Sequence, residues 1–308
     1  MTITQLKYIV AVDNHRHFAK AAEACFVTQP TLSMQLQKLE EELDILIFDR
    51  SKHPIVPTPL GAKILEQARS VLYEAQVLEQ MAKKIGGKFE GELNIAVIPT
   101  VAPSLLPRFI PEFSHKYPDI KLKIEELKTD DMIEALRQDR IDLGIAATPL
   151  SEKGIEELPL YYEPFMAFVP EYHSMINDEF LLASELNVNN MLLLNEGHCF
   201  RSSVLKICQT ELQQDQRINM ESGNFVTLVK LAHRGLGMTL LPYLNTLDLA
   251  AKYKKGIKPI AEPTPTREIS MLYTRTQLKQ EWIHAMAAVI QSTLPEKLLE
   301  KSDHIISP

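Results

Sequence analysis

Two of the three cysteines in this 308-residue chain, Cys199 and Cys208, lie nine positions apart, and the first has neighbours that can activate a thiol. Cys199 follows His198 and precedes a predicted helix over about 202–212. The free N–H groups at a helix start favour a thiolate, and His198 and Arg201 can add positive charge or hydrogen bonds. The thiolate is the form of cysteine that attacks oxidants. The opposite interpretation stays open, because two cysteines can equally be small, buried hydrophobic residues.

Alternating strand and helix patterns predict the framework that positions this segment. Strand patterns lie at 93–97, 122–124, 141–146, 165–169, 191–194, 238–241 and 269–273. Helical patterns lie at 104–117, 132–137, 200–212, 225–234 and 277–294. This alternation is typical of an α/β domain with a mostly parallel sheet. We expect two lobes, with the last strand and helix returning to the first, and a cleft between lobes is a common ligand site.

The first 58 residues carry short helical patterns instead. Thr4 can cap a first helix, a small-residue helix follows at 18–25, and a three-residue turn leads to a third helix from Gln29. In that third helix, leucines recur at spacings of 4, 3 and 4, so they form one apolar stripe and leave a polar face opposite. The pattern indicates a DNA-binding helix-turn-helix, followed by a short hairpin or wing at 48–57. A plain helical hairpin that only packs is the alternative.

A long helix is predicted from Thr58, its cap, and Pro59 to the pair Gly86-Gly87. Its small and apolar residues keep a strict heptad spacing, at Ile64, Ala68, Val71, Ala75, Leu78, Ala82 and Ile85. Such a seam favours a close contact between two helices and therefore dimerisation. The alternative is one amphipathic helix on a globular core.

Several N-terminal motifs closely resemble the LysR-type transcriptional regulators. They are Phe-Ala-Lys-Ala-Ala-Glu at 18–23, Val-Thr-Gln-Pro-Thr-Leu-Ser at 27–33, the leucine-rich 35–43, Leu-Ile-Phe-Asp-Arg at 46–50 and Thr-Pro-Leu-Gly at 58–61. The resemblance implies a third helix in the major groove, a wing on the DNA backbone, a helix that pairs subunits, and a two-lobed effector domain like that of periplasmic binding proteins. The resemblance therefore implies a multidomain α+β fold. It also implies that the protein is not an enzyme.

The same resemblance assigns DNA contacts. Gln29, Pro30, Thr31 and Ser33 would approach the DNA, with Arg50 on the wing. Gln can bind adenine through two hydrogen bonds, and hydroxyl groups and Arg reach phosphates or base edges. Many members have Arg where this chain has Met34, which removes one possible contact. Residues 1–58 hold six Lys or Arg and seven Asp or Glu, so we expect modest non-specific affinity.

A narrower resemblance, to peroxide-sensing members of the family, lies in the second lobe. It comprises Gly-His-Cys-Phe-Arg at 197–201, Cys208, and Gly-Leu-Gly-Met-Thr-Leu-Leu-Pro at 235–242; the pattern Ile-Pro-Thr-Val at 98–101, Thr129 and Arg267 also match. It implies that hydrogen peroxide oxidises Cys199, that Cys208 then closes a disulfide, and that Thr100, Thr129, His198 and Arg267 form the peroxide pocket. On one straight helix, residues nine apart are about 13.5 Å apart along its axis, whereas a disulfide needs Cα atoms within about 7 Å. The helix would therefore have to rearrange. Cys25 is expected in the core.

Composition limits how the protein can bind DNA and where in the cell it can act. The net charge of −7 excludes DNA binding by bulk positive charge, and no apolar run approaches the roughly 18–20 residues of a membrane span. The few cysteines, and an N-terminus without the basic and apolar stretches of a secretion signal, favour a cytoplasmic location for the protein. We expect no metal and no cofactor. The resemblance implies that the protein binds double-stranded DNA and RNA polymerase. It also implies a homodimer that assembles into a homotetramer, and a role as an activator of transcription.

Domain boundaries follow from these patterns. They are 1–58 for DNA binding, 59–90 for the linker helix and hinge, 91–162 with 266–300 for the first lobe, and 163–265 for the second. Three alternatives remain: a family member that senses a metabolite, a thiol peroxidase, and a solute-binding protein, which would need an export signal.

Overall fold

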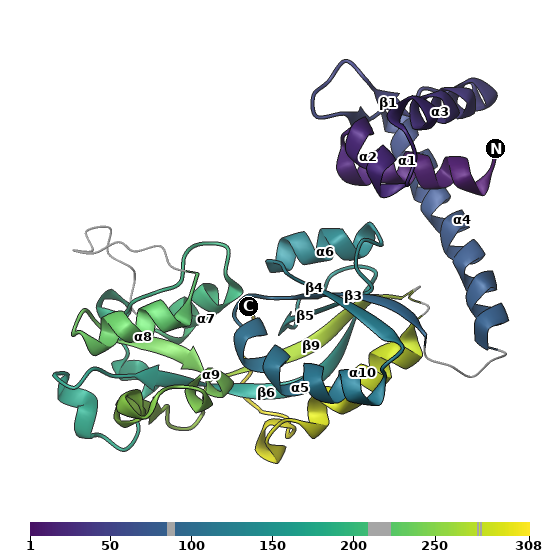
Figure 1. Ribbon diagram of the computed structural model, residues 1–308. Coiled ribbons are helices and arrows are strands. Elements are labelled where there is room, and N and C mark those ends of the chain that lie inside the picture. The colour runs from purple at the N-terminus through teal and green to yellow at the C-terminus, as the bar shows by residue number, and fades with distance from the viewer. Residues whose placement is uncertain (85–89, 209–222, 276, 278) are drawn as a thin grey trace. The chain divides into compact units, whose positions relative to one another are not determined.

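The computed structural model describes residues 1–84, 90–208, 223–275, 277 and 279–308. It divides into two compact units, residues 1–88 and 89–308, which we describe separately (Figure 1). The predicted hinge at Gly86-Gly87, and the seam position Ile85, lie outside the described residues.

The first unit is a helical domain with a small wing. Its elements are α1 (Ile3–His15), α2 (Phe18–Ala24), α3 (Gln29–Leu43), β1 (Phe48–Asp49), β2 (Val56–Pro57) and the long α4 (Pro59–Lys84). The predicted cap at Thr4 is wrong. Thr2 caps α1, because its hydroxyl accepts a hydrogen bond from the Gln5 N–H while the Gln5 side chain accepts one from the Thr2 N–H. The Thr58 hydroxyl caps α4 as predicted, accepting from the Gly61 N–H at 2.9 Å.

The leucine stripe of α3 forms the core of this unit. Leu32, Leu36 and Leu39 are fully buried, and the first turns of α4 complete the same core with Leu65 and Ala68. The predicted α4 seam is therefore divided. Its first positions, Ile64 and Ala68, pack within their own unit, whereas Val71 and Leu78 are 41% and 71% exposed.

The second unit contains two sheets that share one long strand, β6. The strands are β3 (Gly91–Val97), β4 (Ile120–Glu126), β5 (Leu143–Thr148), β6 (Ile155–Phe168), β7 (Thr239–Pro242), β8 (Ile257–Pro259) and β9 (Thr266–Thr274). Their order is β4-β3-β5-β9-β6-β7, with β8 also beside β6. Strand β3 pairs in parallel with β4 and with β5. The prediction of a mostly parallel sheet is wrong, since β9 pairs antiparallel with β5 and β6, and β6 antiparallel with β7 and β8.

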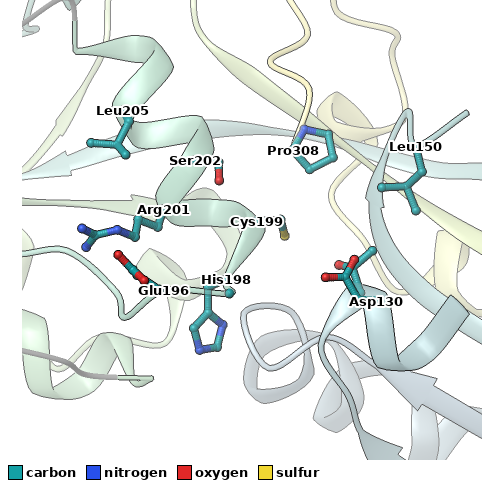
Figure 2. A pocket seen from close by; sticks show the side chains of 11 residues that line it. Asp130, Leu150, Glu196, His198, Cys199, Arg201, Ser202, Leu205 and Pro308 are labelled. Carbon is teal, nitrogen blue, oxygen red and sulfur yellow. The ribbon is translucent and has the colours of Figure 1, made fainter. Parts of the chain in front are cut away.

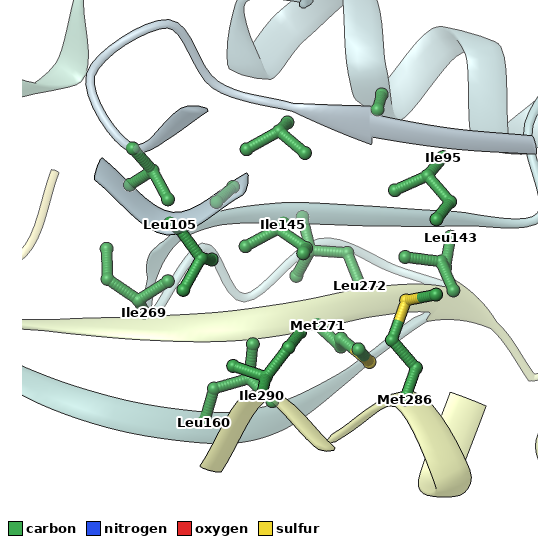
Figure 3. Close-up of a cluster of buried hydrophobic side chains, with 14 of the residues drawn as sticks. Ile95, Leu105, Leu143, Ile145, Leu160, Ile269, Met271, Leu272, Met286 and Ile290 are labelled. Atoms are coloured by element: carbon green, nitrogen blue, oxygen red, sulfur yellow. The ribbon is translucent and has the colours of Figure 1, made fainter. Parts of the chain in front are cut away.

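Helices cover these sheets and enclose two hydrophobic cores. The helices are α5 (Ala102–Lys116), α6 (Thr129–Arg137), α7 (Cys199–Ile207), α8 (Phe225–His233), α9 (Tyr243–Leu247) and α10 (Gln280–Ser292), with short 3₁₀ turns at 174–177, 183–185, 188–190, 251–256 and 296–298. The first core joins Ile95, Ile145 and Met271 of the strands to Met286 and Ile290 of α10 (Figure 3). The predicted return of the last strand and helix to the first lobe is thus confirmed. The second core lies around α7, α8 and β7.

Strand β6 connects the lobes. Residues 155–164 pair with β9 in the first lobe, and residues 165–168 pair with β7 in the second. The expected strand at 191–194 is wrong: Met191 makes only an isolated bridge to Met238.

Candidate functional site

Cys199 is the first residue of α7 and lies where the two lobes meet. It packs against the core of the first lobe although its helix belongs to the second. The chain enters this helix through Gly197, whose φ of +83° favours glycine. A Cβ on Gly197 would also come within 2.7 Å of Lys128 Nζ. The Lys128 ammonium, which precedes α6, donates to the carbonyl oxygen of Glu196 at 3.3 Å and so links the lobes beside the thiol.

A pocket of about 460 Å³ opens in front of the thiol (Figure 2). Its wall comes from both lobes and from the C-terminal segment: Thr129, Asp130, Leu150, Glu196, Gly197, His198, Cys199, Arg201, Ser202, Leu205 and Pro308. Two of the four predicted peroxide-pocket residues, Thr129 and His198, therefore share one cavity with Cys199. Thr129 is the first residue of α6, and its hydroxyl hydrogen-bonds the thiol.

The other two predicted pocket residues, Thr100 and Arg267, form a buried layer that does not line the cavity. The Arg267 guanidinium donates to the Thr100 hydroxyl and to the Thr100 carbonyl oxygen, each at 3.3 Å. It also donates through Nε and Nη2 to one carboxylate oxygen of Glu163, at 3.0 and 2.7 Å. Arg267 and Glu163 are 2% and 0% exposed, so this pair is taken out of water.

The predicted activation of Cys199 holds only for the helix start: the backbone N–H groups of Cys199 and Phe200 lower the thiol pKa, whereas neither His198 nor Arg201 contributes. Burial raises the pKa of the Cys199 thiol, and this outweighs the opposing effects of the Arg267 charge, the Thr129 hydroxyl and the Phe200 N–H. The cation that acts on the thiol is thus Arg267, not Arg201. Arg201 points away from the sulfur (Figure 2) and donates to the Leu194 carbonyl oxygen at 2.9 Å.

His198 is not a source of positive charge near neutral pH. Burial and the nearby Lys128 ammonium both lower the pKa of its imidazole. A neutral imidazole can donate one hydrogen bond and accept another in the pocket.

Cys208 lies at the other end of α7, as the residue that caps it. It is buried in the core of the second lobe, with its sulfur 3.5 Å from the Met191 sulfur. Burial raises the pKa of the Cys208 thiol to about 11. Cys199, Cys208 and Cys25 are all free thiols. The helix between the first two spans 199–207, shorter than expected; residues 209–212 of the predicted helix lie outside the described residues.

The predicted DNA contacts lie together in the first unit. Gln29, Pro30 and Thr31 are exposed and Ser33 is half-buried, all in the first turns of α3. Arg50 follows β1 and has a structural contact: its guanidinium pairs with the buried Glu40 carboxylate at 2.6 Å and lies over the Phe18 ring. Glu40 also accepts the Ile47 N–H at 2.8 Å, so this group holds the wing on α3.

Comparison with known proteins identifies the family. The model of the bacterial regulatory helix-turn-helix protein, lysR family, matches residues 3–62, and that of the LysR substrate binding domain matches residues 86–295. The chain belongs to the LysR family. The family consists of transcriptional regulators, not enzymes.

Several relatives and solved structures that are similar to this chain carry the name OxyR or hydrogen peroxide-inducible genes activator. The hydrogen peroxide-inducible genes activator of Haemophilus influenzae is 34% identical over 275 residues, covering 89% of this chain and 90% of that protein. OxyR, a dual regulator of Escherichia coli K12, is 34% identical and covers 89% of each chain. A full-length OxyR variant from Pseudomonas aeruginosa matches with a TM-score of 0.79 at 34% identity, covering 94% of this chain and 98% of that one. A peroxide-bound OxyR mutant from Corynebacterium glutamicum matches with a TM-score of 0.62 at 28% identity, covering 95% and 92%.

Two further features, a metal site and a membrane-spanning helix, are absent from the described part of the chain. The described residues contain no group of three or more His, Cys, Asp or Glu side chains placed to hold a metal ion. No helix among the described residues is long and apolar enough to cross a membrane.

Sequence reasoning missed three parts of the site: Glu163, Lys128 and the C-terminal segment that ends at Pro308. Glu163 lies in Tyr-Tyr-Glu-Pro, where nothing in the sequence marks a buried carboxylate. Its register opposite Arg267 on β9 is the signal that would have found it, and that register appears only once the strands are paired.

Proposed function

We propose that this chain is a cytoplasmic transcriptional regulator that senses hydrogen peroxide through Cys199 and transmits the signal by a disulfide with Cys208. The observation that carries the proposal is the place of Cys199: it lines an interlobe pocket, at the start of the helix that Cys208 ends. Arg267 and the Thr129 hydroxyl favour its thiolate. The names of the relatives point to the same ligand.

The chemistry needs no other redox partner. The Cys199 thiolate attacks one peroxide oxygen, the O–O bond breaks, and the leaving hydroxide takes a proton to form water, which leaves a sulfenic acid on Cys199. The Cys208 thiolate then attacks that sulfur and a second water leaves, so that the disulfide holds both oxidised sulfurs. The Thr129 hydroxyl, which lines the pocket, can stabilise the developing hydroxide directly, and the Arg267 charge can stabilise it from the buried layer behind the thiol.

Closing this disulfide must change α7. Cys199 and Cys208 are nine positions apart, which along a helix is about 13.5 Å, and a disulfide requires Cα atoms within about 7 Å. Cys208 must also leave the core of the second lobe. We infer that oxidation unwinds or shifts α7, and that this rearrangement is the output of the sensor.

Thiol counting and peptide mapping test this function. After one equivalent of hydrogen peroxide, we expect two thiols to disappear and one peptide to contain a 199–208 disulfide, while Cys25 stays free. Cys199→Ser should abolish the reaction, and Cys208→Ser should stop at the sulfenic acid. Cys25→Ser is the matched control and should react as the wild type does. A wild-type protein whose thiols survive this treatment would refute the proposal.

For DNA binding, we propose that Gln29, Pro30, Thr31 and Ser33 approach the major groove and that Arg50 contacts the backbone beside the wing. Replacing Ser33 or Gln29 by Ala should weaken specific binding by about 1–3 kcal/mol if each contacts a base. The expected assembly is a homodimer that forms a homotetramer and contacts RNA polymerase as an activator. Footprinting should show paired half-sites about one helical turn, or a multiple of it, apart. Unchanged affinity in both Ala variants would remove these residues from the interface.

A further inference from the structure

Glu163 is a fully buried carboxylate beside the reactive site, and the chemistry above gives it no part. Residues 163 and 267 are direct partners in the antiparallel pair of β6 and β9. One carboxylate oxygen accepts Nε and Nη2 of Arg267, at 3.0 and 2.7 Å. The other accepts the backbone N–H of Leu244 at 2.7 Å. Both oxygens of Glu163 therefore act only as acceptors.

These contacts fix the orientation of Arg267. The guanidinium makes four hydrogen bonds, two to Glu163 and two to Thr100, and its carbon lies 5.3 Å from the centre of the Phe200 ring. Phe200 follows Cys199 in α7, so the same guanidinium contacts the helix that carries the thiol. Held in this way, the guanidinium keeps its charge near Cys199 without entering the pocket.

Glu163 also joins the site to the crossing between lobes. Its strand pairs with β9 up to residue 164 and with β7 from residue 165, so the carboxylate lies one residue before the chain changes sheets. Leu244, which donates to it, belongs to α9 directly after β7, yet its side chain is buried in the core of the first lobe. The Glu163 side chain thus links Arg267 on β9 to Leu244 on α9, beside the point where β6 passes from the first lobe to the second.

We propose that Glu163 is a positioning residue for the oxidation of Cys199: it holds the Arg267 guanidinium against Thr100 and against the ring of Phe200, the residue after Cys199, and it requires a carboxylate to do so. The inference rests on the proposed function. A glutamine of the same size would place an NH₂ donor against either the guanidinium or the Leu244 N–H, so it must lose one of the two contacts. An unpaired buried donor is unfavourable, and Arg267 would shift from its place against Thr100 and Phe200.

A second physical effect of Glu163 acts in the opposite direction. Its negative charge partly neutralises Arg267, so a carboxylate that mattered only through charge would slow Cys199 oxidation, and its removal would accelerate the reaction. Other charged or titratable groups around the pair and the thiol are present in every variant below and stay constant: Arg108, Asp130, Tyr161, Glu196, His198 and Arg201. The sign of the change therefore separates positioning from neutralisation.

The test uses the full chain with Cys208→Ser, which isolates the first oxidation step. The second-order rate constant for sulfenic acid formation is measured by trapping with dimedone at roughly pH 6 to 10, a range around the ordinary thiol pKa. We expect Glu163→Gln to lower this constant at least about tenfold near pH 7.5, because the orienting contacts are lost, and to move the rise in rate to higher pH. Glu163→Asp keeps the charge but is shorter, and should give an intermediate rate.

Glu156→Gln is the matched control. Glu156 also lies on β6, and its carboxylate pairs across the strands with Arg275, but at the surface. It should react as the parent does. Arg267→Lys should slow the parent, and its effect should largely disappear when Glu163 is already Gln, since both changes remove the same orientation.

Three outcomes overturn the inference: a Glu163→Gln rate equal to the parent's, a faster rate, or fully additive effects of Glu163→Gln and Arg267→Lys. If Glu163→Gln fails to fold, as judged by circular dichroism, Glu163→Asp becomes the test variant. An unchanged rate of sulfenic acid formation in Glu163→Asp would then contradict the inference. A parent that is itself not oxidised at Cys199 refutes the proposed function and is thereby distinguished from a failure of Glu163 alone.

Discussion

At the scale of single residues, the pKa of Cys199 determines when the thiol can react. Burial raises that pKa above its ordinary value, while Arg267 and the Thr129 hydroxyl limit the rise. Because only the thiolate is nucleophilic, a raised pKa moves the increase of reactivity to higher pH. At neutral pH the rate then depends on stabilisation of the leaving group in the pocket as well as on the thiolate fraction.

This balance predicts a pH profile. In Cys208→Ser protein, the rate of Cys199 alkylation by iodoacetamide should still be rising at about pH 8.5, the ordinary thiol pKa. Thr129→Val removes a hydrogen bond that lowers the pKa, so it should slow alkylation at pH 8 and move the profile further upward. Thr129→Ser keeps the hydroxyl and is the control. A plateau below about pH 8 in the parent would contradict the burial argument.

Phe26 offers a separate prediction about stability. It lies in the turn of the helix-turn-helix with a φ of +56°, and its side chain is 96% exposed. A left-handed backbone disfavours a bulky residue and suits Asn. Phe26→Asn should therefore raise the free energy of unfolding of the first unit by about 0.5–1 kcal/mol, measured by denaturant unfolding of the full chain. Met34→Asn, at an exposed position inside α3, should instead lower it; equal shifts for both would contradict the backbone explanation.

At the residue scale, the sequence predicted which residues gather around Cys199 better than it predicted which charges act on the thiol. The resemblance brought Thr100, Thr129, His198, Cys199 and Arg267 into one region, and the structure places three of them in the cavity and two behind it. It could not show that Arg201, two positions from the thiol, turns to Leu194. Side-chain direction within the first turn of a helix depends on the packing around it, which adjacency in sequence does not reveal.

At the scale of elements, the C-terminal segment holds α7 from outside. The N–H of Ile306 donates to the Thr266 carbonyl oxygen at 2.7 Å, beside Arg267 on β9. From α7, Lys206 donates to Ser307 and Pro308 oxygens at 2.9–3.2 Å. Pro308 lines the Cys199 pocket. A rearrangement of α7 must therefore break these contacts.

Lys206→Met should loosen this attachment. Loss of a charge-assisted contact at the surface is worth about 0.5–1 kcal/mol, which is about a two- to fivefold faster amide exchange at residues 304–308 and in α7. Hydrogen exchange of the reduced protein measures it. Lys230→Met, at the end of α8 in the same lobe, is the control. Equal exchange in the parent and both variants would show that the Lys206 contacts do not hold the segment.

Element prediction failed where the pattern of the chain was broken. Strand β6 was expected only at its end, 165–169, yet it begins at Ile155. A register shift between Pro159 and Tyr161 reverses which side chains face the core, so one alternation never continues through the strand. The parallel sheet was overestimated for a related reason: the partners of β9 are distant in sequence, and only their pairing shows that the strand runs antiparallel.

At the scale of the whole molecule, α4 carries apolar side chains that its own unit does not bury. Val71 and Leu78 keep the heptad spacing and are exposed, while Ala68 and Leu65, about one and two turns before Val71, are buried in the first unit. The helix thus changes from an intramolecular to an exposed apolar face along its length. A second copy of the same helix would cover that face with a complementary seam.

Leu78→Glu should therefore weaken the dimer. A buried leucine contributes about 1.5–3 kcal/mol, and a symmetric dimer loses it twice, so the dimer dissociation constant should rise at least about 100-fold. Sedimentation equilibrium measures this constant, and the footprint on DNA should shrink from paired half-sites to one. Ser70→Glu introduces the same charge on the outer face of α4 and should leave both unchanged. If Leu78→Glu stays dimeric at the concentrations where the wild type does, the subunits pair through another surface.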